Sequence, residues 1–310
     1  MFVLPLALTC GLASLAILDP VRQNPKVLSA FLGTAAILCI WNAVLFFWSR
    51  ARGRTLVLHV ALRKQHYVQA ITQIAVVLYW GWYWPEVYAA APFILAQLVF
   101  AYAFDMLLCW SRRDTYTFGF GPFPVILSIN LLLWFRPDWF YLQLAMVAVG
   151  FGAKEFIRWN KDGRRTHIFN PSSFPLAVFA LGLLATGTSD ITWGTEIALT
   201  QFFPPQMYLM LFLVSLPGQF FFRVTSMTMS AVVSTYLFGF VYYQMTGIYF
   251  FYDSYIPLAV FLGMHLLFND PSTSPATELG RIMYGALYGL STIVLYQLLG
   301  SAGMPTFYDK

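Results

Sequence analysis

Long apolar runs separated by short polar segments fill most of the chain. We read eleven apolar spans, at about 2–19, 27–48, 67–84, 91–109, 116–135, 139–157, 173–187, 206–222, 227–247, 255–268 and 282–300. A helix of about 20 apolar residues is long enough to cross the hydrocarbon core of a bilayer. The pattern therefore predicts an all-α integral membrane protein with about 11 transmembrane helices.

The composition agrees with a chain built mainly from such spans. Hydrophobic residues make up 59% of the 310 residues, charged residues 10% and aromatic residues 19%, far from the charge content of a water-soluble domain. We expect residues 1–60 to form N-terminal membrane anchor helices and a basic cytoplasmic loop, and residues 61–310 to form the core membrane domain. Cys10, Cys39 and Cys109 all fall inside spans, and we expect them to be packing residues.

The basic residues are distributed unevenly about the predicted spans. When the 18 Lys and Arg residues are assigned to alternate sides, fourteen fall on one side, and the exceptions are Arg22, Lys26, Arg136 and Lys310. The positive-inside rule makes that side cytoplasmic. We therefore expect a multi-pass protein of the cell membrane (the bacterial inner membrane) with a cytoplasmic N-terminus. The net charge of +5 then indicates bilayer topology, and no nucleic acid is expected as a partner.

Several spans are interrupted by helix-breaking residues. The span that begins FGFGPFP has two glycines and two prolines at its start, which leaves about a dozen residues of helix, too few for a full crossing. Irregular backbone at membrane depth must be buried in protein or line a cavity. The fragments HIFNP from His167 and HLLFNDP from His265 hint at a repeat. In transporters, such broken segments mark the binding site of an inverted repeat, so we expect an inverted-repeat core with broken helices.

The segment from His167 to Ser172 is the first candidate binding site. Phe169, Asn170 and Pro171 precede an apolar run, and Ser172 follows them. A helix start carries open N–H donors and partial positive charge, so it can hold a phosphate or another anion, and His167 adds to the basic character. The alternative is an ordinary capped helix behind a basic loop, which the local pattern favours.

The segment FNDPSTSPATELGR, from Phe268 to Arg281, is the second candidate. Its polar side chains are Asp270, Ser272, Thr273, Ser274 and Thr277. Glu278 and Arg281 follow at a spacing that allows them to pair on a helix. A simple connection rarely needs so many polar groups between two prolines, so we favour a binding role over a solvated loop.

Asp105 is the third candidate because it lies in the middle of the span VFAYAFDMLLCW. A charged side chain at the centre of a bilayer costs roughly 2.5–3.5 kcal/mol or more, so it needs a partner or a function. One hypothesis is an ion or proton path; the other is a buried carboxylate bonded to backbone or to a tyrosine. No catalytic residue is proposed, and no metal site, because no HExxH motif or nucleophile elbow appears and the cysteines lack metal-ligand spacing.

Three motifs in this order resemble a known family. They are Phe169-Asn170-Pro171, the run from Asp270 to Pro275, and Gly280-Arg281 followed by Gly285-Ala286-Leu287. Over roughly residues 60 to 300 the chain resembles the family that contains the D-type membrane subunit of the Rnf electron-transport complex and the B-type membrane subunit of the sodium-pumping NADH:quinone reductase. The resemblance implies about ten core helices in an inverted repeat. It also implies flavin-linked electron transport coupled to ion movement, beside other membrane protein subunits.

Two departures from that family change the expected chemistry. The family attaches a flavin phosphate to a threonine in an S-G-A-T-type motif, and here only Ala185-Thr186 remains, after Leu183 and Leu184; the family also continues beyond the last span. The missing motif argues against covalent flavin. We therefore expect noncovalent FMN or riboflavin, or a quinone, in at most a subunit of a membrane oxidoreductase. The alternative is a small-solute transporter or a non-redox scaffold subunit of a membrane assembly.

Overall fold

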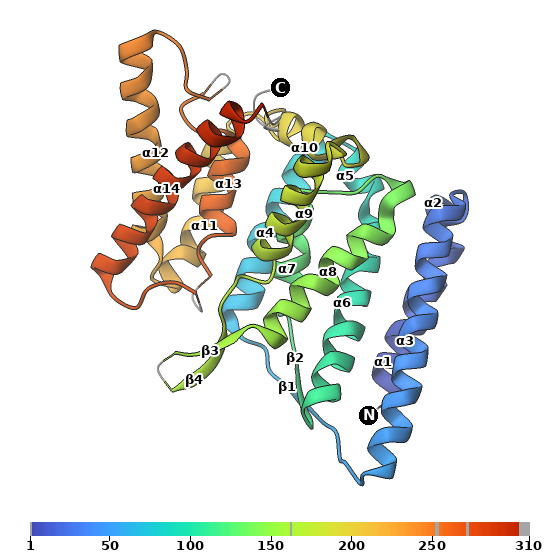
Figure 1. Cartoon of the computed structure of the whole chain (residues 1–310). Helices are drawn as coiled ribbons and strands as arrows, with labels where there is room; N and C mark the ends of the chain where they lie inside the picture. The colour runs from blue at the N-terminus through green and yellow to red at the C-terminus, as the bar shows by residue number, and fades with distance from the viewer. Residues whose placement is uncertain (1, 162, 252–253, 271–272, 304–310) are drawn as a thin grey trace. The chain divides into compact units, whose positions relative to one another are not determined.

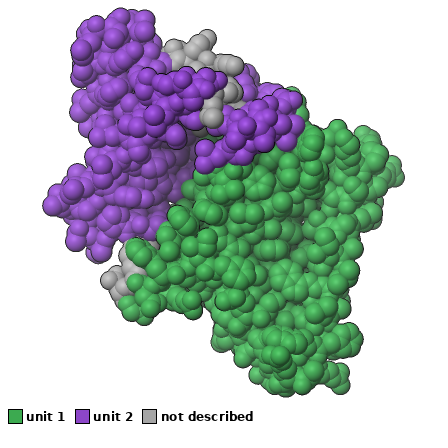
Figure 2. Space-filling view, in the orientation of Figure 1, with its two compact units in different colours: residues 1–70, 86–179 green, residues 71–85, 180–310 purple. Residues whose placement is uncertain are grey.

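The apolar runs fold as α-helices. The computed structural model describes residues 2–161, 163–251, 254–270 and 273–303 (Figure 1). Its contacts divide the chain into unit 1, residues 1–70 and 86–179, and unit 2, residues 71–85 and 180–310 (Figure 2). The sequence analysis expected a different division, into an anchor of residues 1–60 and a core of residues 61–310. That division stays a prediction.

Unit 1 contains the following elements, of which α4 and α9 continue into unit 2. They are α1 Val3–Ser14, η1 Leu15–Ile17, α2 Asp19–Arg22, α3 Pro25–Ala51, β1 Val57–Val60, α4 Lys64–Tyr83, α5 Glu86–Ala89, α6 Ala91–Arg112, β2 Thr115–Phe118, α7 Pro122–Asn130, η2 Pro137–Trp139, α8 Phe140–Phe156, β3 Arg158–Lys161, β4 Arg164–His167 and α9 Ser173–Thr186. The remaining elements belong to unit 2: η3 Ser189–Ile191, α10 Gly194–Thr200, α11 Met207–Phe221, α12 Thr225–Thr246, α13 Leu258–Leu266 and α14 Glu278–Ser301.

Three helices in the described part of the chain are long and apolar enough to cross a membrane: α3, α6 and α14. The outer faces of α3 and α14 are apolar as well. On α3, Ile37 and Ile40 are each 65% exposed, and on α14 Leu287 is 61% exposed. Large aliphatic side chains in such an exposed row are unfavourable in water and suit hydrocarbon. The other expected spans among the eleven stay predictions.

Helix α6 forms the centre of unit 1, where it packs against α1, α3, α7 and α8. Rings from three helices meet on one side of it. Phe140 of α8 stacks on Phe31 of α3 with ring centroids 5.4 Å apart, and lies 5.2 Å from Phe93 of α6. Phe31 is fully buried, and burying one such ring contributes roughly 1.5–3 kcal/mol. These contacts fix the position of α6 and of the charged residues at its end.

A polar clamp holds the start of α3 against η2. Asn24 caps α3 by accepting hydrogen bonds from the backbone N–H groups of Lys26 and Val27, and its side-chain amide donates to Asp138 at 2.9 Å. Lys26 pairs with the same carboxylate at 3.3 Å. The hydrogen bond from Asn24 and then that from Lys26 lower the pKa of Asp138 from its ordinary value of 3.8.

Four short strands interrupt the helical pattern within the described residues, and the all-α expectation did not include them. Strands β1 and β2 pair in parallel, with Val57 opposite Thr115, and β3 and β4 form an antiparallel hairpin with Arg158 opposite His167. Arg54 pairs with Asp114 at 2.6 Å beside the first ladder. The strands arise because backbone next to a helix end must find hydrogen-bond partners, and the polar loops supply them to one another.

A short helix is present where two glycines and two prolines predicted an interrupted span, and a second short helix lies in unit 2. Helix α7 begins only at Pro122 and is nine residues long, and α13 is also nine residues long. At 1.5 Å per residue each spans about 14 Å, less than half of a bilayer core of about 30 Å. Both are deeply buried, which satisfies the requirement that interrupted helices be enclosed in protein.

In unit 2, α12 and α14 lie along each other with very close backbones. A Cβ atom at Gly285 would collide with the carbonyl oxygen of Met227, and Ser230 Oγ donates to the carbonyl oxygen of Ile282 at 2.7 Å. Gly289 stands one turn further on, against Ala231. This is the small-residue packing that membrane helices use where no hydrophobic force drives them together. Gly285, the second glycine of the third sequence motif, therefore has a structural role.

Candidate functional site

The first candidate segment folds as a helix cap. Asn170 Oδ1 accepts hydrogen bonds from the backbone N–H of Ser172 at 2.9 Å, from its hydroxyl at 2.7 Å and from the N–H of Ser173 at 3.2 Å. These bonds satisfy donors that start α9. The capped-helix alternative thus accounts for Asn170 and Ser172. Gly150 of α8 allows the turn to approach closely, because a Cβ there would collide with the carbonyl oxygen of Pro171.

The other two residues of the first segment lie beside this cap. Phe169 stacks on Phe174 with ring centroids 4.9 Å apart and is 45% exposed. His167 lies in β4, paired with Arg158 of β3. Together with the cap they form one local group in unit 1.

The second candidate segment is a tight turn before α14. The backbone carbonyl of Asp270 accepts from the Ser274 hydroxyl at 2.7 Å and from the Thr273 hydroxyl at 3.2 Å. Thr277 caps α14 by accepting from the N–H of Gly280 at 3.1 Å. Ser272 lies outside the described residues. The hydroxyls therefore stabilise the turn from within, and the group belongs to unit 2, whereas the first group and Asp105 belong to unit 1.

The pair expected between Glu278 and Arg281 is confirmed, at 3.3 Å. Arg281 also donates from Nε to the carbonyl oxygen of Pro275 at 3.1 Å. The guanidinium thus ties the first turn of α14 to the preceding turn, and only 17% of its side chain is exposed.

Asp105 lies in a buried polar cluster at one end of α6. It is 5% exposed, and its carboxylate lies 3.4 Å from Lys154 Nζ on α8. Burial, followed by the nearby charge of Asp105, raises the pKa of Tyr116 of β2 well above its ordinary range. Asp105 therefore has the partner that its cost in hydrocarbon requires. A buried carboxylate was one of the two hypotheses drawn from the sequence, and its ionic partner in the structure is Lys154.

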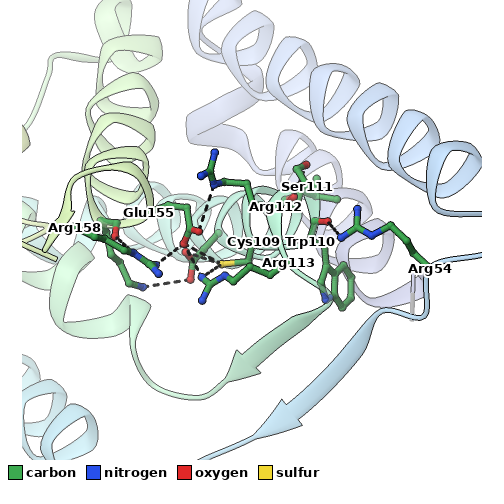
Figure 3. A network of polar contacts seen from close by, with 11 residues as sticks. Arg54, Cys109, Trp110, Ser111, Arg112, Arg113, Glu155 and Arg158 are labelled. Atoms are coloured by element: carbon green, nitrogen blue, oxygen red, sulfur yellow. Dashed lines mark hydrogen bonds and ion pairs between the residues drawn. The ribbon is translucent and has the colours of Figure 1, made fainter. Parts of the chain in front are cut away.

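Glu155 of α8 is the centre of the same cluster, and the sequence analysis did not count it among the candidate site residues (Figure 3). Its carboxylate lies 2.6 Å from Arg113, 2.5 Å from Arg158 and 3.7 Å from Arg112. The signal was available: Arg158 follows Glu155 by three residues, a spacing that pairs side chains on adjacent turns. Arg112 and Arg113, at the end of α6, could not be assigned to Glu155 without knowing that α6 and α8 pack together.

Cys109 joins the two carboxylates. Its sulfur lies 3.9 Å from Asp105 Oδ1 and 3.8 Å from Glu155 Oε2, and Arg113 donates to it at 3.0 Å. A thiol can both donate and accept a hydrogen bond, weakly. Cys109 is buried, as expected for a packing residue, and it also forms the polar link between the two acids.

The cluster is asymmetric in charge and in exposure. Two carboxylates, each 5–8% exposed, face four cations whose side chains are 17–48% exposed: Arg112, Arg113, Lys154 and Arg158. The cations extend toward the surface, as amphipathic side chains do, while the acids stay inside. Asp105 lies about 10 Å along the α6 axis from Arg112, at 1.5 Å per residue. The two acids and Cys109 thus form one buried polar group between α6 and α8.

A second polar group, made only of amides, closes the end of α7. Gln97 Oε1 accepts from Asn130 at 2.9 Å and from Gln143 at 3.1 Å, and Gln143 accepts from the backbone N–H of Phe135 at 3.0 Å. All three amide side chains are buried. Gln143 thereby satisfies the N–H of Phe135 in the segment that follows α7, so this group holds that segment in place.

Comparison with known proteins gives no further assignment. No protein-family description, no curated protein and no solved structure matches the chain.

Proposed function

We propose that the chain is a membrane subunit of an electron-transport-type complex, which binds a flavin or a quinone and takes part in coupled ion movement. The observation that supports it most is the buried row of Glu155 on α8 with Cys109 and Asp105 on α6, which is apolar and long enough to cross a membrane. Ionisable groups are retained at such depth mainly where ions or protons move.

The row has the properties that a proton or cation step requires. Both acids are buried and each has cationic partners that keep its charge tolerable. The Cys109 sulfur lies 3.9 Å from one acid and 3.8 Å from the other, so a small rearrangement passes a proton between them. Arg112 and Arg113 pair with Glu155 and are 48% and 42% exposed, so this end of the row lies near the aqueous surface.

The cofactor and the repeat rest on the resemblance to the family of the D-type Rnf membrane subunit. One structural feature supports the repeat: α6, α7 and α8 run in the order 22, nine and 17 residues, and α12, α13 and α14 in the order 22, nine and 24. A short buried helix thus sits between two longer ones in each unit. In inverted-repeat proteins such interrupted helices surround the bound substrate.

Location and partners follow from the same proposal. The chain spans the bacterial inner membrane with its N-terminus in the cytoplasm, and it works beside other membrane subunits that bring electrons to it and take them away. The chain itself is at most one subunit of a membrane oxidoreductase.

Cofactor content tests the proposal. The full-length protein is purified in mild detergent, extracted with organic solvent, and the extract is analysed by mass spectrometry beside an unrelated membrane protein purified in the same way. We expect flavin or quinone at a substantial fraction of one per chain. An extract equal to that of the control protein would overturn the redox assignment.

The paired Asp105 and Lys154 equally favour a second function, transport of a small solute or ion without redox chemistry. In vesicles containing the protein, we then expect Asp105→Asn to abolish uptake of the transported solute or ion. Asp138→Asn, which changes an exposed carboxylate on the α3 clamp, should leave that uptake unchanged. Uptake that survives Asp105→Asn would contradict this second function. A scaffold would show neither cofactor nor uptake and would co-purify with partner chains.

A further inference from the structure

The outer edge of β1 carries backbone groups that β2 does not use (Figure 1). The backbone N–H of Val57 donates to the carbonyl oxygen of Asp114, just ahead of β2, at 2.6 Å, and that of Ala61 donates to the last residue of β2 at 2.9 Å. In a parallel ladder, alternate residues of a strand bond to the same neighbouring strand. The N–H and C=O groups of Leu58 and Val60 therefore face away from β2.

This edge is open and has an apolar row beside it. No backbone hydrogen bond joins Leu58 or Val60 to a further element within the described part of the chain. The side chain of Val60 is 70% exposed, and that of Leu62, just after the strand, is 64% exposed. Because side chains alternate between the two faces of a strand, Leu58, Val60 and Leu62 lie on one face. The edge thus offers donors and acceptors next to exposed apolar side chains.

Neither water nor lipid suits both parts of this edge. Hydrocarbon accommodates the apolar side chains but leaves the peptide groups unsatisfied, and water satisfies the peptide groups but not the apolar row. A ladder of only two strands is also marginal by itself, and parallel sheets are normally covered. An extended chain paired with β1 resolves both, since its peptide groups bond to the edge while its alternate side chains pack beside the row.

The charges next to the edge indicate which kind of chain pairs there. Arg63 and Lys64 follow shortly after β1, both are exposed, and neither has an ion pair among the described residues. No Asp or Glu occurs from residue 55 to residue 85. Arg54, ahead of β1, is already paired with Asp114. An edge with free positive charge at one end selects a partner with acidic side chains.

We propose that β1 binds an extended, acidic segment of a partner subunit as an additional strand of the β1–β2 ladder. The inference goes beyond the proposed function, because it assigns an interaction surface that does not depend on a bound cofactor. The basic residues around β1 put this surface on the cytoplasmic side by the positive-inside rule, so the segment belongs to a cytoplasmic part of the partner.

Synthetic peptides test the surface on the purified full-length protein in mild detergent. One fluorescent peptide alternates glutamate with valine, and a second alternates lysine with valine; fluorescence anisotropy measures the affinity of each. We expect the acidic peptide to bind about tenfold more tightly, because its charges attract Arg63 and Lys64 where those of the basic peptide repel them. Equal affinities, or binding of neither peptide, would overturn the inference.

Val60→Pro tests the edge itself. It removes an N–H that faces outward and leaves the bonds to β2 intact, a place where a strand tolerates proline. We expect it to weaken binding of the acidic peptide about tenfold, through the lost hydrogen bond. Thr117→Pro is the matched control: Thr117 lies opposite His59 in the register, so its N–H faces the other edge, and the affinity should not change. Binding that survives Val60→Pro would place the peptide elsewhere and contradict the inference.

A measurement on the unaltered protein guards against a variant that does not fold. Hydrogen exchange followed residue by residue should show a fast amide at Val60 and a protected amide at His59, which faces β2. Adding the acidic peptide should slow exchange at Val60. A Val60 amide already protected in the free protein would mean that a second copy of the chain or lipid covers the edge, and would refute the inference. Retained cofactor without peptide binding would contradict this inference alone, whereas peptide binding without retained cofactor would contradict the proposed function alone.

Discussion

Replacing Glu155 by glutamine tests whether the charged cluster is held together by that carboxylate. The side chain of Glu155 is 5% exposed and lies 2.6 Å from Arg113 and 2.5 Å from Arg158. Removing one partner of a fully buried ion pair costs about 3–5 kcal/mol. The Arg112 and Arg113 side chains are 48% and 42% exposed and can regain water, whereas Arg158, at 17%, cannot. We therefore expect Glu155→Gln to lower the free energy of unfolding by about 2–3 kcal/mol.

The assay is equilibrium unfolding of the purified protein in mixed micelles of mild and denaturing detergent. Glu278→Gln is the matched control, since Glu278 also pairs with an arginine three residues later but is 64% exposed. Such surface pairs contribute about 0–1 kcal/mol, so this variant should stay close to the natural protein. If Glu155→Gln is no more destabilising than Glu278→Gln, the carboxylate is not what holds the arginines, and the cluster as described is wrong.

Three further variants test other parts of the structure. Gly285→Ala should destabilise by about 2 kcal/mol in the same assay, because the new methyl meets the backbone of Met227, whereas Gly182→Ala, with open space at its Cβ, should not destabilise. Thr277→Ala should cost about 1 kcal/mol through loss of the α14 cap, and an unchanged midpoint would contradict that role. The pKa of Asp138 is lower in the folded protein than its unfolded value of 3.8, so the ionised carboxylate stabilises the fold above that pH, and this stabilisation is lost as the pH falls below it. Asp138→Asn should therefore remove this pH dependence of the free energy of unfolding in that acidic range alone.

The sequence alone predicted the features that depend on local chemistry. Two glycines and two prolines before Val125 predicted an interrupted helix, and the structure has a helix of nine residues there. The spacing of Glu278 and Arg281 predicted their pair. Asp105 inside an apolar run predicted a buried acid with a partner. Each of these follows from the preferences of residues only a few positions apart.

The remainder depends on contacts between distant segments, which a single sequence does not reveal. Cys109 was assigned to packing, and only the approach of α8 to α6 shows that it links two acids. The pairing of β1 with β2 joins segments that no hydrophobic period marks. Asn170 was considered a binding residue because helix starts attract anions, but its oxygen is already used by the backbone of α9. The same residue types serve as caps and as ligands, so the pattern alone did not decide between them.

The absorption spectrum of the purified full-length protein, recorded oxidised and then chemically reduced, tests the central claim most directly. We expect a reversible difference between the two spectra that carries the bands of a flavin or a quinone and corresponds to a substantial fraction of one cofactor per chain. Two superimposable spectra from a folded protein purified with its membrane partners would contradict the assignment to electron transport.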